Sequence, residues 1–306
     1  MLMKNRRVHF VFVVVAAIAV GVVLTFAVQG NSQSKASGTK SPVKPTVYTP
    51  ANSSASKAPK PSVFAEAAIK NASLRNDLSW TFGGKTQRGW YLYDLLIRRT
   101  LKTDSDPTSA DFAEALADWQ KDRGLEASGI LDEDTLMSMI SKWQNDRLKD
   151  RTIPTVDQLV TAPPSDFYDP ERLPELRPVQ RNTYDAYRKM IAAAIADPTL
   201  KLAHNVGELA PQEKYFKIVS AFRSREYQEK LRREAPNAGS AGLAVNSPHF
   251  TGRALDLYVG GDPVDTKDSN RAIQVNSAAY KWLVKNAERF GFRPYFYEPW
   301  HWEYVK

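Results

Sequence analysis

The feature that most constrains this chain is a nineteen-residue apolar run near its start, Phe10–Val28, in which only Thr25 is polar. A run of this length can cross the hydrocarbon core of a bilayer as one helix. Three basic residues precede the run, and positive charge on that side predicts that the amino end stays in the cytoplasm. We therefore expect residues 1–30 to form a basic start and a transmembrane anchor or signal segment, with the rest of the chain exported.

The same run can be compared with a cleaved signal peptide, which has a shorter apolar core and a cleavage site of small residues. Here the core is long, and the Val-Gln-Gly-Asn sequence that ends it is a poor cleavage site. These features favour an uncleaved anchor, and the alternative of a cleaved signal stays open. Both alternatives place the later residues outside the cytoplasm.

The net charge of +8 is concentrated in the N-terminal arm. Residues 1–62 contain eight Lys and Arg and no Asp or Glu, so the rest of the chain has 34 basic and 34 acidic residues. The folded part therefore has no basic excess for binding nucleic acid. Residues 31–62 are rich in Ser, Pro, Lys and Ala and lack the apolar residues that offset ordering entropy, so we expect a disordered linker.

Periodic hydrophobicity begins at Val63 and predicts helices over residues 89–101, 109–125 and 131–144. Ser109 and Asp132 are suited to cap the second and third of these helices. We expect residues 63–146 to form a small all-α domain of three helices. Residues 147–175 contain five prolines and are predicted to be a connector.

The final segment, residues 176–306, mixes the two kinds of pattern. Helices are expected over residues 179–197, 224–235 and 276–291, and strands over residues 214–222, 253–259 and 292–305, the last as two strands around a turn. Because helices and strands do not alternate regularly, an α+β fold is favoured over a parallel doubly wound sheet. We expect a mixed or antiparallel sheet flanked by helices.

Two of the four histidines lie in patterns that suit a metal site. His249 and Asp256 are seven residues apart with Gly252 between them, a spacing typical of a loop turning back beside the start of a strand. His301 is distant in sequence but can lie on the neighbouring strand. The chain has no cysteine, so a metal would be held by histidine and carboxylate. Two imidazoles and one carboxylate form a three-ligand zinc site with an open fourth position, as in catalytic centres.

Two charged residues can act beside such a site. Glu298 lies three residues before His301 and can reach the open position, where a carboxylate can accept a proton from water and return it to a leaving amine. Arg223 ends a predicted strand and precedes a helix start. It can bind a substrate carboxylate or a developing oxyanion, or it can form a surface salt bridge.

Three motifs resemble one family of enzymes. The sequence SPHFTGRALD, at residues 247–256, fits S-x-H-x-x-G-x-A-x-D at every fixed position. SAFRSREYQ resembles S-G-Y-R-S-x-x-x-Q, with Ala221 and Phe222 in place of Gly and Tyr, and EPWHWEY fits E-P-W-H-[WF]. In this order and spacing the motifs resemble the zinc D-alanyl-D-alanine carboxypeptidases of the VanY type, over roughly residues 165–306. Glu303 stands where a basic residue is common in relatives, which leaves substrate preference open.

This resemblance implies a zinc ion on three ligands, His249, Asp256 and His301. It also implies that Glu298 is the general base and acid, that Arg223 stabilises the transition state and that Ser247 contacts the substrate. The implied reaction is hydrolysis of the terminal D-alanyl-D-alanine bond of peptidoglycan stem peptides. The alternatives are a zinc endopeptidase that cuts within the stem peptide or cross-bridge, and a non-catalytic wall-binding protein that keeps zinc.

A second resemblance concerns residues 111–140, which are similar to the peptidoglycan-binding domain found beside many wall hydrolases, with Trp119-Gln120 in place of Phe-Gln. It implies that the helical domain targets the enzyme to the wall. The expected location is the bacterial cell membrane, with one N-terminal span and the other domains outside the cytoplasm, or secretion if the signal is cleaved.

Overall fold

The computed structural model describes residues 63–234 and 246–306. The predicted transmembrane segment, residues 1–30, and the predicted linker, residues 31–62, lie outside the described residues. Within the described ranges, no helix combines the length and the apolarity that a bilayer span requires. Residues 59–306 form one compact unit.

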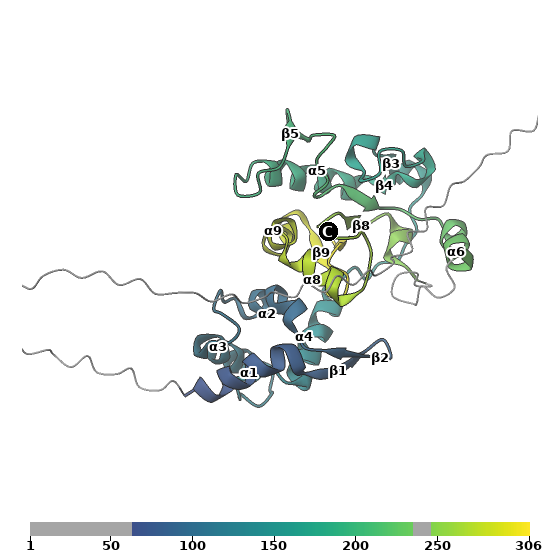
Figure 1. Ribbon diagram of the computed structural model, residues 1–306. Helices are drawn as coiled ribbons and strands as arrows, with labels where there is room; N and C mark the ends of the chain where they lie inside the picture. Colours follow the sequence, from purple (N-terminus) through teal and green to yellow (C-terminus); the bar gives the residue numbers. More distant parts are fainter. Residues whose placement is uncertain (1–62, 235–245) are drawn as a thin grey trace, which may run out of the picture. The chain divides into compact units, whose positions relative to one another are not determined.

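The N-terminal region, residues 63–146, contains four helices and a β-hairpin (Figure 1). Its elements are α1 Ala65–Asp77, β1 Ser79–Phe82, β2 Lys85–Arg88, α2 Asp94–Leu101, α3 Ala110–Asp122 and α4 Glu133–Asn145. The expectation of an all-α domain is therefore wrong. The hairpin forms because Gly83 and Gly84 both adopt positive φ, the backbone geometry that a tight two-residue turn between antiparallel strands requires.

The predicted helix caps of this region are confirmed. The Ser109 side chain accepts a hydrogen bond from the backbone N–H of Phe112, and the Asp132 side chain accepts one from Thr135. These bonds satisfy N–H groups that have no partner inside the helix. Phe112 and Leu116 of α3 are fully buried, because the helix turns its apolar face inward.

The connecting residues are less irregular than their prolines suggest. Strand β3, Leu159–Thr161, pairs in antiparallel register with β4, Pro178–Gln180. Strand β4 occupies the start of the predicted helix over residues 179–197, so α5 begins later and spans Arg181–Ile195. A short hairpin of β5, His204–Asn205, and β6, Glu208–Leu209, follows α5.

The C-terminal region, residues 176–306, is built around a four-stranded antiparallel sheet, as the α+β prediction requires. The strand order is β7 Ile218–Ser220, β8 Ala254–Leu257, β10 His301–Tyr304 and β9 Phe292–Pro294. The helices around it are α5, α6 Arg225–Glu234, α8 Asp268–Asn276 and α9 Ala278–Asn286. Strand β7 is shorter than the expected 214–222, because Phe216 has a φ of 66° and interrupts the extended backbone.

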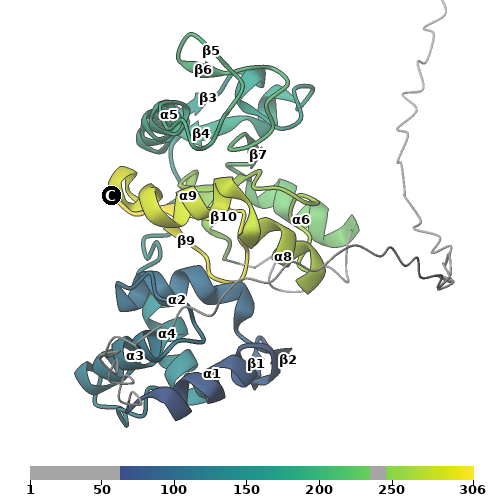
Figure 2. The ribbon, with the colours of Figure 1, turned by 60° about the vertical axis from the view of Figure 1, so that its left-hand side comes forward.

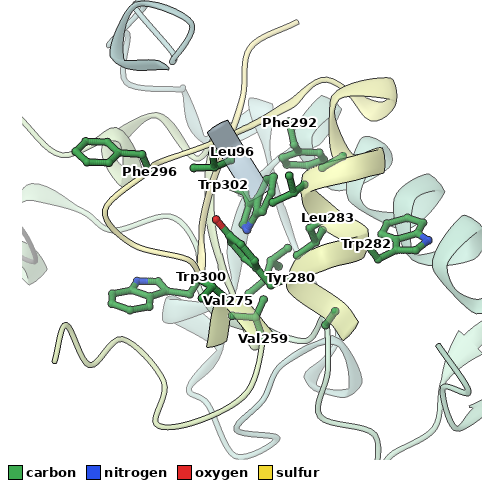
Figure 3. Packing of buried hydrophobic residues seen from close by; sticks show 14 of the residues in the cluster. Leu96, Val259, Val275, Tyr280, Trp282, Leu283, Phe292, Phe296, Trp300 and Trp302 are labelled. Atoms are coloured by element: carbon green, nitrogen blue, oxygen red, sulfur yellow. The ribbon is translucent and has the colours of Figure 1, made fainter. Parts of the chain in front are cut away.

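The core of the C-terminal region lies between the sheet and α9. Figure 3 shows Trp302 of β10 and Phe292 of β9 packing with Tyr280 and Leu283 of the helix. These side chains are almost fully shielded from solvent. Their burial fixes β10 against β8, and β8 and β10 carry two residues of the predicted site.

The N-terminal region packs directly on the turn between β9 and β10. Helix α2 contacts α9 (Figure 2). Phe296, in the turn, lies with its ring centroid 4.8 Å from that of Phe82 and 6.0 Å from that of Trp143. Buried side chains of both regions therefore belong to one hydrophobic core.

Candidate metal centre

The three predicted ligands come from two neighbouring strands and the loop that precedes one of them. His249 lies in the 3-10 turn Pro248–Thr251, Asp256 in β8, and His301 opens β10. His301 and Asp256 are direct partners in the antiparallel register, although 45 residues separate them in sequence. The placement of His301 on the strand beside Asp256 agrees with the sequence prediction.

The turn between His249 and Asp256 depends on Gly252. Its φ is 64°, and a Cβ atom added there would lie 2.9 Å from the backbone nitrogen of Gln180. A side chain at this position would be strained and would push β4 away. The glycine therefore lets the loop close, as its place in the motif predicts.

The side chains of the three residues meet in a buried cluster. One possible ligand atom from each, an imidazole nitrogen or a carboxylate oxygen, lies within 4.8 Å of the others. His249 Nε2 is 3.3 Å from Asp256 Oδ2, and His301 Nδ1 is 2.9 Å from Asp256 Oδ1. Two nitrogens and one oxygen at this separation form a donor set typical of zinc.

The second nitrogen of each imidazole faces an acceptor. His249 Nδ1 lies 2.7 Å from the carbonyl oxygen of Ala221, and His301 Nε2 lies 3.2 Å from Glu303 Oε1. If each of these nitrogens carries the proton, the lone pairs of His249 Nε2 and His301 Nδ1 point into the cluster. Acceptors of this kind orient metal-binding histidines and fix their tautomer.

The cluster also shifts the pKa values of its members in different directions. Burial and the charge of Arg223 lower the pKa of His249 to about 4, so its imidazole is neutral. Burial alone would lower the pKa of His301, but its hydrogen bonds with Asp256 and Glu303 outweigh burial and raise the value to about 9. Burial would raise the pKa of Asp256, yet the adjacent imidazoles hold it well below the usual range.

Glu298 lies in the tight turn that leads into β10. Its backbone N–H donates to Tyr295 O at 3.2 Å, and the N–H of His301 donates to the Glu298 carbonyl at 2.9 Å. The side chain is 6% exposed, and its Oε1 has no hydrogen-bond partner among the described residues. Burial raises the pKa of Glu298 to about 7. A carboxyl with this pKa can both accept and donate a proton near neutral pH.

Arg223 and Ser247 border the cluster. Arg223 Nη2 donates to Asp256 Oδ2 at 2.9 Å, and Arg223 Nε donates to Ser220 Oγ at the same distance. The surface salt bridge considered from the sequence is therefore not what forms, because the arginine is paired with the buried Asp256. Ser247 is also buried, and its Oγ accepts from the backbone N–H of His249 at 3.3 Å.

The sequence reasoning did not give Glu303 a place in this site. It is 0% exposed, and its contact with His301 makes it part of the cluster's surroundings. The sequence could have suggested this placement, because Glu303 lies two residues after His301 on a predicted strand, and residues two apart on a strand face the same side of the sheet. His204, which lies outside the motifs, is exposed.

Comparisons with known proteins agree with the motifs. Residues 179–306 match the family model described as VanY: D-alanyl-D-alanine carboxypeptidase. The search of the curated proteins gave no significant match.

Among solved structures, VanYB in complex with D-alanine-D-alanine is 22% identical, with a TM-score of 0.27 over 42% of this chain and 72% of that chain. A mutant of the vancomycin-resistance D,D-pentapeptidase VanY, in complex with Zn(II), is 21% identical, with a TM-score of 0.26 over 42% and 74%. The family match confirms the resemblance and the prediction of an enzyme. The His–Asp–His cluster agrees with the predicted zinc cofactor. Residues 179–306 of this chain are therefore similar to the VanY D-alanyl-D-alanine carboxypeptidase family.

Proposed function

We propose that this chain is a zinc-dependent carboxypeptidase that removes the terminal D-alanine from peptidoglycan stem peptides ending in D-alanyl-D-alanine. The observation that carries the proposal is one buried cluster, in which a His–Asp–His ligand set lies near a carboxylate oxygen that has no hydrogen-bond partner within residues 63–234 and 246–306. That cluster belongs to the segment that matches the carboxypeptidase family.

His249, Asp256 and His301 would hold the metal. The residues fit zinc because they offer two nitrogens and one oxygen within 4.8 Å of one another, and because acceptors hold the other imidazole nitrogens. Three protein ligands leave a coordination position open, as a catalytic site requires. Zinc, when bound, supplies Lewis-acid polarisation of the scissile carbonyl.

Glu298 would carry the proton of the reaction. In its ionised form the carboxylate accepts a proton from the attacking water, and it then delivers this proton to the nitrogen of the departing D-alanine. The raised pKa of about 7 suits both steps, because neither form of the carboxyl is strongly favoured at neutral pH. The low exposure of Glu298 also limits exchange of that proton with bulk solvent.

Arg223 and Ser247 would hold the substrate and its transition state. The guanidinium of Arg223 is fixed by Asp256 and Ser220, so its positive charge needs no reorganisation when negative charge develops on the carbonyl oxygen. The Ser247 hydroxyl keeps its proton for the substrate, since its oxygen is the acceptor in the bond with His249.

The remaining parts would bring the enzyme to its substrate. Residues 63–146 would bind the wall, in keeping with their resemblance to peptidoglycan-binding domains. The apolar run within residues 1–30 would anchor the chain in the membrane, and residues 31–62 would span the distance to the wall.

The test uses residues 59–306, the compact unit, and a muropeptide that carries a pentapeptide. We expect zinc-dependent loss of one alanine, read as a mass change, abolished by a chelator and restored by zinc. The Glu298→Gln variant is the matched control and should bind zinc without turnover. Release of a longer peptide fragment would indicate an endopeptidase. An intact pentapeptide on the zinc-loaded protein would indicate a wall-binding protein.

A further inference from the structure

Glu303 is a fully buried carboxylate on the same strand as the metal ligand His301. Both of its oxygens are engaged: Oε1 faces His301 Nε2 at 3.2 Å, and Oε2 accepts from the backbone N–H of Leu148 at 2.9 Å. A carboxyl group that is 0% exposed needs compensation from hydrogen-bond donors or an opposite charge.

That compensation comes from Arg147, just after α4. Its Nε donates to Glu303 Oε1 at 3.1 Å, and its Nη2 contacts the same oxygen. Arg147 Nη1 donates to Gln144 at 2.8 Å, and the guanidinium lies 3.9 Å from the ring centroid of Tyr295. The arginine is thus held from three sides. Arg147 and Leu148 both lie outside the family-matched segment, residues 179–306.

The two imidazoles of the metal cluster face different hydrogen-bond acceptors. His249 Nδ1 faces a neutral backbone carbonyl, whereas His301 Nε2 faces a carboxylate. A carboxylate acceptor orients the ring and increases its basicity as a ligand more than a carbonyl does. Among the described residues, the hydrogen bonds to this carboxylate other than that of His301 come from residues 147 and 148, and the positive charge of Arg151 also acts on it.

We propose that Glu303 is a positioning residue for the ligand His301, and that Arg147 holds Glu303 in place from outside the family segment. The metal centre is then completed by the stretch that joins the N-terminal region to the rest of the chain. This inference rests on the proposed zinc site and adds a residue pair that the three motifs do not contain.

A purely structural role is the competing explanation, because a buried ion pair between distant segments also stabilises their docking. The two roles differ in what they predict for the folded protein. A docking pair affects unfolding only, whereas a positioning residue also affects how tightly the folded protein binds zinc.

The experiment compares Glu303→Gln with wild type in residues 59–306. Glutamine keeps the shape but removes the charge, and its amide nitrogen must face either the Leu148 N–H or the donors of Arg147 and His301. We expect zinc affinity, measured by competition with a chromophoric chelator below the unfolding transition, to fall about 10- to 100-fold. With saturating zinc, kcat should fall while KM stays the same, since Glu303 has no contact with Arg223 or Ser247.

Glu288→Gln is the matched control. Glu288 pairs with Arg99 of α2 and thus also joins the two regions, but it has no contact with a predicted ligand. It should lower stability without changing zinc affinity. Arg147→Lys keeps a positive charge beside Glu303 and should give a smaller loss of zinc affinity than Glu303→Gln, which keeps the test usable if the glutamine variant folds poorly.

Unchanged zinc affinity in Glu303→Gln, with only a lower unfolding temperature, would overturn the inference and leave the proposed function intact. An equal loss of affinity in Glu288→Gln would also overturn it, because the effect would then come from docking. Failure of the wild type to bind zinc would instead refute the proposed metal site, so the two failures are distinguishable.

Discussion

Replacing Glu298 by glutamine should separate catalysis from stability. Glu298 has a buried carboxyl group, one oxygen of which is unpaired in the part of the chain that the structure describes, and its pKa is raised from 4.5 to about 7. Its folded-state pKa exceeds the unfolded value, so the folded protein binds this proton more tightly than the unfolded chain does. The stabilisation from that proton is present below about pH 4.5 and is lost as pH rises through about 7.

The magnitude follows from the size of the pKa difference. Each pKa unit corresponds to about 1.4 kcal/mol, so between pH 5 and pH 8 the metal-free wild type should lose roughly 2–3 kcal/mol that Glu298→Gln does not lose. The variant should therefore gain stability relative to wild type as pH rises. Its kcat should fall by about 10²- to 10⁴-fold, since the proton acceptor is gone, while zinc binding is retained.

The assay is urea unfolding of both proteins at pH 5 and pH 8 after removal of metal with a chelator. Groups that titrate in both proteins contribute equally to the two free energies of unfolding, so their contributions cancel when the variant is compared with wild type. Glu114→Gln, at an exposed position of α3, sets the background for a glutamate-to-glutamine change. If the difference in unfolding free energy between wild type and Glu298→Gln is the same at pH 5 and pH 8, burial does not oppose the ionisation of Glu298, and the reasoning is refuted. Retained turnover would remove it from its catalytic role.

Two further substitutions test the ligand set and the packing. His301→Ala should bring the zinc content of the purified protein close to zero in metal analysis, and a fully metallated, active variant would refute the proposed ligands. Phe296→Ala should cost about 3–5 kcal/mol in urea unfolding, because a 2%-exposed ring between Phe82 and Trp143 would be replaced by a cavity. A loss below about 1 kcal/mol would mean that the site closes by collapse or that this ring carries little of the docking.

The site residues could be placed from sequence because strand geometry limits where they can go. His249 and Asp256 are separated by a short loop with a glycine at the position that needs positive φ, so their proximity follows from local structure. His301 is distant in sequence, but its neighbours have the composition of a strand. Pairing of that strand with β8 then brought the histidine opposite Asp256.

The parts that sequence reasoning missed depend on short or non-local features. The β1–β2 hairpin has only four residues in each strand, too few for a clear alternation, and its Gly-Gly turn was the remaining clue. Helix α8 lies in a polar stretch without a marked apolar face. The partnership of Arg147 with Glu303 joins residues 156 positions apart, and no periodicity links them.

The alternation along β10 explains how one strand serves both the core and the metal cluster. Trp302 points into the core beside Tyr280, while His301 and Glu303, one residue to either side, face the cluster. Because both faces of the strand are buried, a shift by one residue would put Trp302 into the metal cluster and His301 and Glu303 into the apolar core. The same packing that stabilises the sheet therefore fixes the register of His301 opposite Asp256. It also obliges the chain to supply a cation for Glu303, and Arg147 meets that requirement.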